Sequence, residues 1–184
     1  MPLDFSAIPW DAVGIQLIGF AAMALAFASY QAKKRTTILT VQILSSTLWA
    51  LQFFLLGAAA GLANNLIAIV RNAIFAQQEK HAWARARLLP AIFILLYVAA
   101  AVYAYTLEGW LCLLPLFGMV LQTFAYNCEN ERSIRLLSLG VSPPWLVYDA
   151  IKSSAAGVLC ESLNILSILL ALFRYRDNKK EANK

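Results

Sequence analysis

Seven apolar runs, each about 20 residues long, fill most of this 184-residue chain, and each is long enough to cross a bilayer as a helix. Only 14% of the residues are charged, against about 25% in a typical soluble domain. This composition excludes a soluble enzyme, a nucleic-acid-binding module and a disordered protein. We therefore expect an all-α membrane protein with seven transmembrane helices in a single domain. The runs lie at about 12–30, 37–57, 58–77, 88–106, 109–127, 134–151 and 153–173.

Positive charge is concentrated on one side of the predicted membrane. Of the fifteen Lys and Arg residues, thirteen follow the first, third, fifth and seventh spans, while Lys152 lies on the opposite side and Arg71 inside a span. Because cytoplasmic loops are enriched in Lys and Arg, this pattern predicts an external N-terminus and an internal C-terminus. Residues 174–184 then form a basic cytoplasmic tail. The first residues lack the basic region of a signal peptide, so we expect the first run to remain as a span.

The sequence also repeats itself at an offset of 96 residues without a gap. Trp49 falls on Trp145, and Ala59-Ala60-Gly61 falls on Ala155-Ala156-Gly157. Matches of alanine and leucine are common in membrane sequences, but a tryptophan pair and a triplet in one register are not. We interpret this pattern as two copies of a three-helix unit.

The two copies are separated by one further span. Residues 12–77 form the first repeat, 109–173 the second, and 88–106 the linker helix. One extra crossing makes two three-helix bundles parallel, which gives a 3+1+3 arrangement about an axis along the membrane normal. Solute sites of such repeat proteins lie between the two halves.

Polar side chains inside the spans identify a candidate site, because such residues usually face a protein interior or a cavity. At about 1.5 Å per residue, Trp49, Asn65, Trp145 and Glu161 lie about 11–12 Å below the turns that end their hairpins. They should meet in one layer, where tryptophan faces stack on rings and Asn and Glu fix orientation by hydrogen bonds. The neighbouring amides Asn64 and Asn164 complete the predicted solute site.

Some of these residues also have structural interpretations. Tryptophan anchors spans at membrane interfaces, and Asn64 and Asn65 could simply hydrogen-bond neighbouring helices. Asp149 and Lys152 are three residues apart at the outer end of their span, where we expect a solvated pair.

Glu161 is the most informative charged residue, and Arg71 is the intramembrane cation that could meet it. Glu161 could bind a coupling proton, bind a cationic or hydroxyl-rich solute, or join the repeats by pairing with Arg71. The two depths differ by roughly 8 Å. Arg71 could equally extend to lipid phosphates.

Pro143 and Pro144 stand inside the sixth span. They remove two backbone donors, so we expect a kink or break there and a flex point beneath Trp145.

No pattern for catalysis or metal binding is present. The one histidine, His81, lies in a basic loop, and Cys112, Cys128 and Cys160 lack metal-ligand spacing. There is no HExxH, GxSxG or glycine-rich phosphate loop. We expect no enzyme, no metal and no cofactor.

Short motifs give a resemblance. The segment Gln52-Phe53-Phe54-Leu55-Leu56-Gly57 with Ala68-Ile69-Val70-Arg71-Asn72, and Ala156-Gly157-Val158-Leu159-Cys160-Glu161 with Phe173-Arg174-Tyr175, resemble the bacterial inner-membrane YgjV family. The 3+1+3 plan resembles the SWEET, SemiSWEET and PnuC transporters of the PQ-loop superfamily. The chain departs from that superfamily in having no Pro-Gln dipeptide and no proline in its first span.

The resemblance implies a multi-pass protein of the bacterial inner membrane. Trp49, Asn65 and Trp145 match the aromatic-plus-amide pattern of SWEET-like and PnuC-like sites, and Glu161 replaces the second amide. We expect a carrier of a sugar-, nucleoside- or vitamin-like solute that works by alternating access. The alternative is a non-transporting scaffold or sensor that keeps the bundle. The expected partners are lipid and an unidentified solute, with no nucleic acid, and association into a homo-oligomer is left open.

Overall fold

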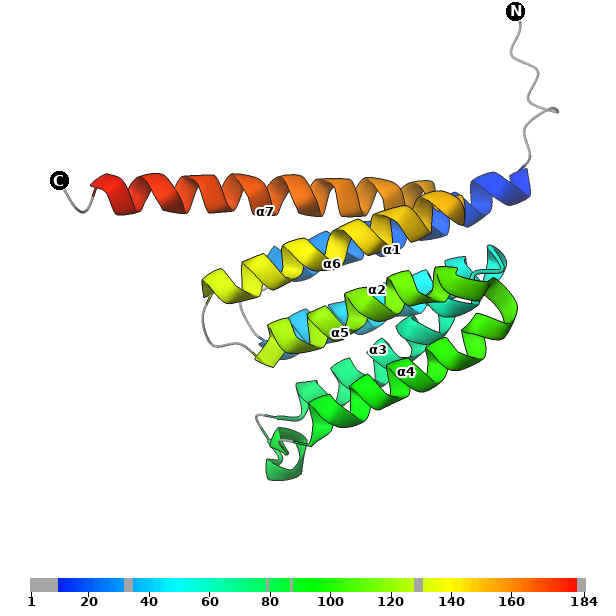
Figure 1. Ribbon diagram of the computed structural model, residues 1–184, viewed down its shortest axis with the longest axis horizontal. Helices are drawn as coiled ribbons and strands as arrows, with labels where there is room; N and C mark the ends of the chain where they lie inside the picture. The colour runs from blue at the N-terminus through cyan, green and yellow to red at the C-terminus, as the bar shows by residue number, and fades with distance from the viewer. Residues whose placement is uncertain (1–9, 32–34, 79, 87, 128–130, 182–184) are drawn as a thin grey trace, which may run out of the picture.

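The computed structural model describes residues 10–31, 35–78, 80–86, 88–127 and 131–181 (Figure 1). Within these ranges the secondary structure is helical and contains no strand, so the predicted all-α class is confirmed. The helices are α1 (Trp10–Gln31), α2 (Arg35–Leu55), α3 (Ala59–Ala76), η2 (Ala82–Arg85), α4 (Leu89–Glu108), η3 (Gly109–Cys112), α5 (Leu113–Asn127), α6 (Glu131–Ile151) and α7 (Ala155–Glu181).

The helix bounds follow the predicted apolar runs to within a few residues, except at the end of α7. α7 continues past residue 173 to Glu181, because a helix can extend beyond its apolar part. α6 is helical on both sides of Pro143 and Pro144, so the break expected there is absent. Their role as a flex point stays a prediction. The basic residues Lys33 and Lys34 lie outside the described residues.

Four segments of the described chain are long and apolar enough to cross a membrane. They are Ala12–Ser29, Thr36–Leu55, Ala59–Ala76 and Leu89–Ala125. The last of these covers α4 and most of α5, and Ala155–Leu169 of α7 is a shorter apolar stretch.

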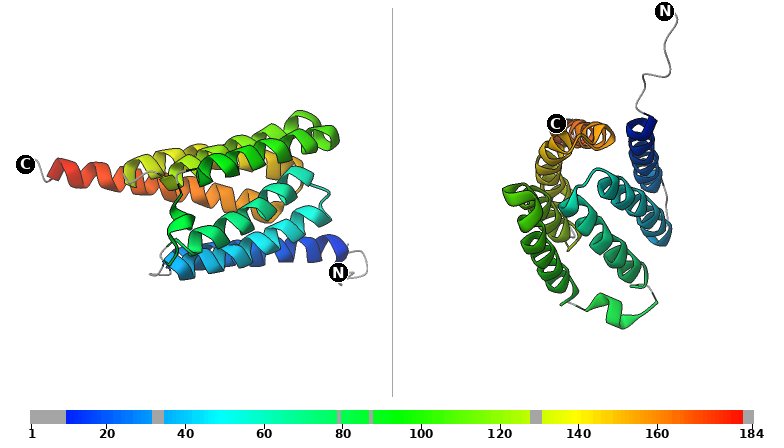
Figure 2. Two further views of the ribbon diagram at one scale, coloured as in Figure 1. Left: turned by 90° about the horizontal axis from the view of Figure 1, so that it is seen from below. Right: turned by 90° about the vertical axis from the view of Figure 1, so that its right-hand side faces the viewer.

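The helices pack in two consecutive sets (Figure 2). α1, α2 and α3 pack against one another in order, and so do α5, α6 and α7. α4 packs on both α3 and α5, while contacts of α1 with α7 and of α3 with α5 join the two sets. The α2–α3 and α6–α7 turns and the α4–α5 junction lie at the same end of the bundle (Figure 1). We call this the hairpin end.

The α2–α3 and α6–α7 turns have the same backbone geometry. Gly57 and Ser153, which are 96 residues apart, both have a positive φ, of 64° and 59°. The hydrogen bonds agree as well: Ala58 N donates to Phe53 O, Gly57 N to Phe54 O, Ser154 N to Asp149 O and Ser153 N to Ala150 O. This is the Schellman arrangement, in which a left-handed residue ends a helix and reverses the chain. Each turn lets the next helix begin within four residues.

Candidate functional site

A cavity of about 590 Å³ lies between the two sets of helices. This volume is in the usual range of roughly 300–1,000 Å³ for small-molecule sites. Side chains from α1, α2, α3, α5, α6 and α7 form its walls. The polar ones are Gln42, Ser45, Ser46, Asn65, Arg71, Asn72, Gln122, Ser142, Asp149, Glu161, Asn164 and Ser167.

The cavity runs along the bundle. Its lining residues on α2 run from Ile38 to Phe53, and those on α7 run from Gly157 to Ile168. On α2 the lining therefore begins three residues after the start of the helix and reaches to two residues before its end, and on α7 it begins two residues after the start of the helix.

Four residues predicted to share a layer do line this cavity together: Trp49, Asn65, Trp145 and Glu161. Asn164 lines it too, and its Nδ2 donates to Glu161 Oε2 at 3.5 Å. The helical periodicity and the equal depths of the sequence positions are thus sufficient to find this part of the wall. Binding of a solute by these residues stays a prediction.

Asn64 is the exception among the predicted solute-binding residues. It is buried in α3 but does not line the cavity, whereas the next residue, Asn65, does. Successive helix residues point about 100° apart, and of these two amides it is Asn65 that points to the cavity. Asn65 also donates from Nδ2 to Gly61 O at 2.9 Å, a bond within its own helix.

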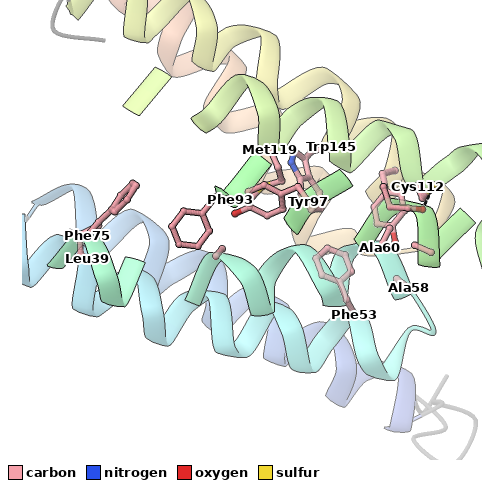
Figure 3. Packing of buried hydrophobic residues seen from close by; sticks show 14 residues of the cluster. Leu39, Phe53, Ala58, Ala60, Phe75, Phe93, Tyr97, Cys112, Met119 and Trp145 are labelled. Carbon is pink, nitrogen blue, oxygen red and sulfur yellow. Dashed lines mark hydrogen bonds between the residues drawn. The ribbon is translucent and has the colours of Figure 1, made fainter. Parts of the chain in front are cut away.

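An aromatic cluster borders the cavity in the half of the bundle nearer the hairpin end. The Phe53 ring centroid lies 6.0 Å from those of Trp49, Trp145 and Tyr148. Figure 3 shows Phe53 of α2 and Trp145 of α6 within the buried cluster that joins the two sets. Gly118 of α5 makes room for Trp145, because a Cβ there would lie 2.6 Å from the indole ring.

Asp149 and Lys152 do not form the solvated pair that the sequence suggested. Asp149 is 3% exposed and lies on the cavity wall, where its carboxyl group packs against the backbone of Gly157. Lys152 instead pairs with Glu108, with Nζ 3.1 Å from Oε1. The prediction was wrong because the α6–α7 turn lies near the end of α4, where Glu108 stands. The sequence of α6 alone does not reveal this contact.

Glu108 also caps the start of α3. Its Oε1 accepts hydrogen bonds from Ala59 N and Ala60 N, and its Oε2 accepts one from the Tyr148 hydroxyl at 3.0 Å. Tyr148 Oη in turn accepts from Gly61 N at 2.9 Å. The otherwise unbonded N–H groups of a helix start are thereby satisfied, and a carboxylate is favourable at that end of the helix dipole.

The start of α7 is capped in a matching way. Gln16 Oε1 accepts from Ala155 N at 3.0 Å, and Gln52 Oε1 accepts from the Ser154 hydroxyl at 3.2 Å. Ala155 stands 96 residues after Ala59, so equivalent helix starts receive side-chain caps from other helices. Because α1 and α2 cap α7, while α4 and α6 cap α3, these contacts tie the hairpin end together.

The sequence model of a family described as bacterial inner membrane protein, Imp-YgjV, matches residues 13–179. The chain belongs to this family. No curated protein and no solved structure is a significant match to it. Together with its apolar helices, the membership makes this YgjV-family chain a multi-pass protein of the bacterial inner membrane.

Arg71 of this YgjV-family protein points inward. It is 2% exposed, lines the cavity, and lies with its Cζ 6.0 Å from the centre of the Tyr97 ring of α4. Its Nε also donates to Asn72 Oδ1 at 3.5 Å. In this arrangement the guanidinium does not extend to lipid phosphates. Arg71 and Glu161 stand on walls of the same cavity, and their pairing stays a prediction.

The sequence analysis did not identify several residues that shape the site. Phe53 and Tyr148 carry no signal in a chain so rich in aromatic and aliphatic residues. Glu108 had a weak one, since it is an acidic residue two positions after the fourth predicted run and just before a glycine. Among the described residues no group of three or more His, Cys, Asp or Glu side chains could hold a metal ion.

Proposed function

We propose that this YgjV-family protein carries a small polar or ring-bearing solute across the inner membrane by alternating access of its two halves. The observation that carries the proposal is the cavity of about 590 Å³, whose walls come from both sets of helices. Trp49 and Trp145 give it two ring faces, and Asn65 and Glu161 add hydrogen-bonding groups. Ring faces combined with a few polar groups are typical of small-molecule sites.

Seven crossings with an external N-terminus and an internal C-terminus are part of this proposal. α6 is not among the four segments of the described chain that are apolar enough to cross, but it has 21 residues and so reaches about 30 Å. Its polar residues Ser142 and Asp149 face the cavity rather than lipid, which supports a crossing despite the low hydrophobicity. The bias of Lys and Arg toward one set of loops supports the orientation.

The two halves of the proposed carrier are α1–α3 and α5–α7, with α4 as the linker. Three observations support this 3+1+3 repeat: the packing order, the two identical turns and the matching caps at Ala59 and Ala155. The same offset of 96 residues relates Gly61, against which Phe53 packs, to Gly157, against which Asp149 packs.

The contacts at the hairpin end support a state that is closed to the outside. Glu108, Lys152 and Tyr148 link α4, the α6–α7 turn and the start of α3, and Tyr148 also belongs to the aromatic cluster. In the proposed cycle these polar contacts separate when the halves rock and the hairpin end opens.

Thermal unfolding of the purified protein tests the proposal. The protein is screened against sugars, nucleosides, vitamins and polar metabolites, and each measurement is repeated with Trp49→Ala. A solute at 100 times its dissociation constant should add about 2.7 kcal/mol to the free energy of unfolding. We expect that gain to be lost in Trp49→Ala and kept in the matched control Trp110→Ala, because Trp110 is 60% exposed and lies outside the cavity.

A solute found in this way must then cross a membrane. Its uptake into liposomes that contain the protein should fall with Trp49→Ala and Trp145→Ala. No stabilisation by any solute, together with normal folding of both tryptophan variants, would instead favour the scaffold or sensor.

A further inference from the structure

Asp149 is a buried carboxyl group on the wall of a cavity inside a membrane protein. Its side chain is 3% exposed, and its Oδ1 receives no hydrogen bond from any described residue. At the equivalent position of the first half, 96 residues earlier, stands the apolar Phe53, which packs on Gly61 as Asp149 packs on Gly157. The first half thus makes the equivalent helix contact without an acid. A buried charge is costly unless an opposite charge meets it.

The nearby cations are engaged elsewhere. Lys152, three residues on, pairs with Glu108 at 3.1 Å and lies 5.9 Å from the centre of the Tyr148 ring. Arg71 lies across the cavity on α3, against Tyr97 and Asn72. Among the described cavity-lining residues there are two acids, Asp149 and Glu161, and one base, Arg71. Even if Arg71 meets Glu161, one carboxylate remains on the wall.

Aromatic faces stand beside that carboxylate. Trp145 precedes Asp149 by four residues on the same face of α6, and both line the cavity. Trp49 lines it from α2. An indole face attracts a cation within about 6 Å through its ring quadrupole, and the attraction grows where water is excluded. A carboxylate next to tryptophan faces is therefore suited to a cationic nitrogen.

We propose that the cavity takes a solute with a cationic nitrogen, an amine or a quaternary ammonium, and that Asp149 is its counter-ion while Trp49 and Trp145 contact it by their ring faces. The inference rests on the proposed function, which it deepens by naming the class of solute. Glu161, Asn164 and Ser142 are hydrogen-bonding groups on the wall for the rest of the molecule.

Matched pairs of small molecules test this assignment. The probes are choline with its uncharged carbon analogue, and phenethylamine with phenethyl alcohol, each added to the purified full-length protein. The readouts are the thermal unfolding midpoint and protection of a cysteine introduced at Ser46, a cavity-lining residue, from a maleimide. The cysteine variant has Cys112, Cys128 and Cys160 replaced by serine.

We expect the cationic member of at least one pair to raise the midpoint and protect the cysteine, and its uncharged partner to do neither at the same concentration. Asp149→Asn keeps the shape of the side chain and should weaken cation binding roughly tenfold or more, which is at least about 1.4 kcal/mol. Trp110→Ala should leave it unchanged. If Asp149→Asn does not fold, the test is the difference in binding between the charged and the uncharged member of each pair, measured on the protein that keeps Asp149.

Three results would overturn the assignment: equal binding of both members of every pair, unchanged cation binding by Asp149→Asn, or no effect of any cationic probe. In each case the wider solute screen shows whether the proposal of transport fails as well, or only the proposal that the solute is cationic. Protection of the Ser46→Cys thiol by uncharged sugars or nucleosides would leave transport standing and reject only the cationic class. Absence of protection by every solute would reject both.

Discussion

Lys152 Nζ lies 3.1 Å from Glu108 Oε1, and this ion pair joins the α6–α7 turn to the end of α4. The side chain of Glu108 is almost fully buried, and its carboxylate also caps the first turn of α3. One side chain of the linker helix thus contacts both halves of the bundle. A group in this position can hold the hairpin end closed, and the halves can separate there only if Glu108 gives up its contacts to one of them.

A double-mutant cycle measures the strength of this link. Glu108→Gln and Lys152→Met should each destabilise the protein, because each leaves one partner of a largely buried pair without its counter-charge. Gln keeps an acceptor for Ala59 N, so the cap is retained. We expect a coupling energy of about 1–3 kcal/mol in the free energy of unfolding, measured by denaturant titration in detergent. Additive effects of the two substitutions would show that the pair contributes no coupling energy to the folded state.

The backbone of the α6–α7 turn gives a second prediction. Ser153 has a φ of 59°, a conformation that costs L-residues about 1–2 kcal/mol, whereas the equivalent Gly57 adopts it without a steric penalty. Ser153 accepts from Gln16 through its backbone carbonyl, which glycine retains. Ser153→Gly should therefore raise the free energy of unfolding by about 0.5–1 kcal/mol. Gly57→Ala is the reciprocal control and should lower it by about 1 kcal/mol; stabilisation by that change would contradict the equivalence.

The fold was largely predictable from the sequence because a bilayer imposes a simple rule on apolar runs. Each run became a helix, and the tight turns at Gly57 and Ser153 followed from the short gap between neighbouring runs. The end of α7 was not predictable in this way. Hydrophobicity marks the part of a helix that needs an apolar environment, not the residue where hydrogen bonding stops.

The site was predictable only where one helix carries the information. Trp49, Asn65, Trp145 and Glu161 could be found from their period and depth, which are properties of single helices. The partner of Lys152 could not, because Glu108 comes from a helix 44 positions earlier and approaches it only through packing.

Close packing at two equivalent glycines gives a third prediction. A Cβ at Gly61 would lie 2.7 Å from the Phe53 ring, and one at Gly157 would meet the Asp149 carboxyl group. Gly61→Ala and Gly157→Ala should each cost about 1–3 kcal/mol of unfolding free energy, because the hairpin helices must move apart. Gly14→Ala in α1 is the matched control. Nothing lies within 4 Å of a Cβ there, so the better helix propensity of alanine should stabilise the protein slightly.

The last prediction concerns Glu161 and Arg71, which face the same cavity from α7 and α3. If the two side chains pair and so connect the halves, Glu161→Gln and Arg71→Gln should each lower stability, and the double variant should lose less than the sum. If Glu161 instead serves the solute, Glu161→Gln should weaken solute binding about tenfold and leave the unfolding midpoint without solute nearly unchanged. Asn164→Ala is the control, since Asn164 donates to Glu161 and a positioning contact should give a smaller effect of the same kind. Unchanged stability together with unchanged binding and uptake in Glu161→Gln would remove Glu161 from the site altogether.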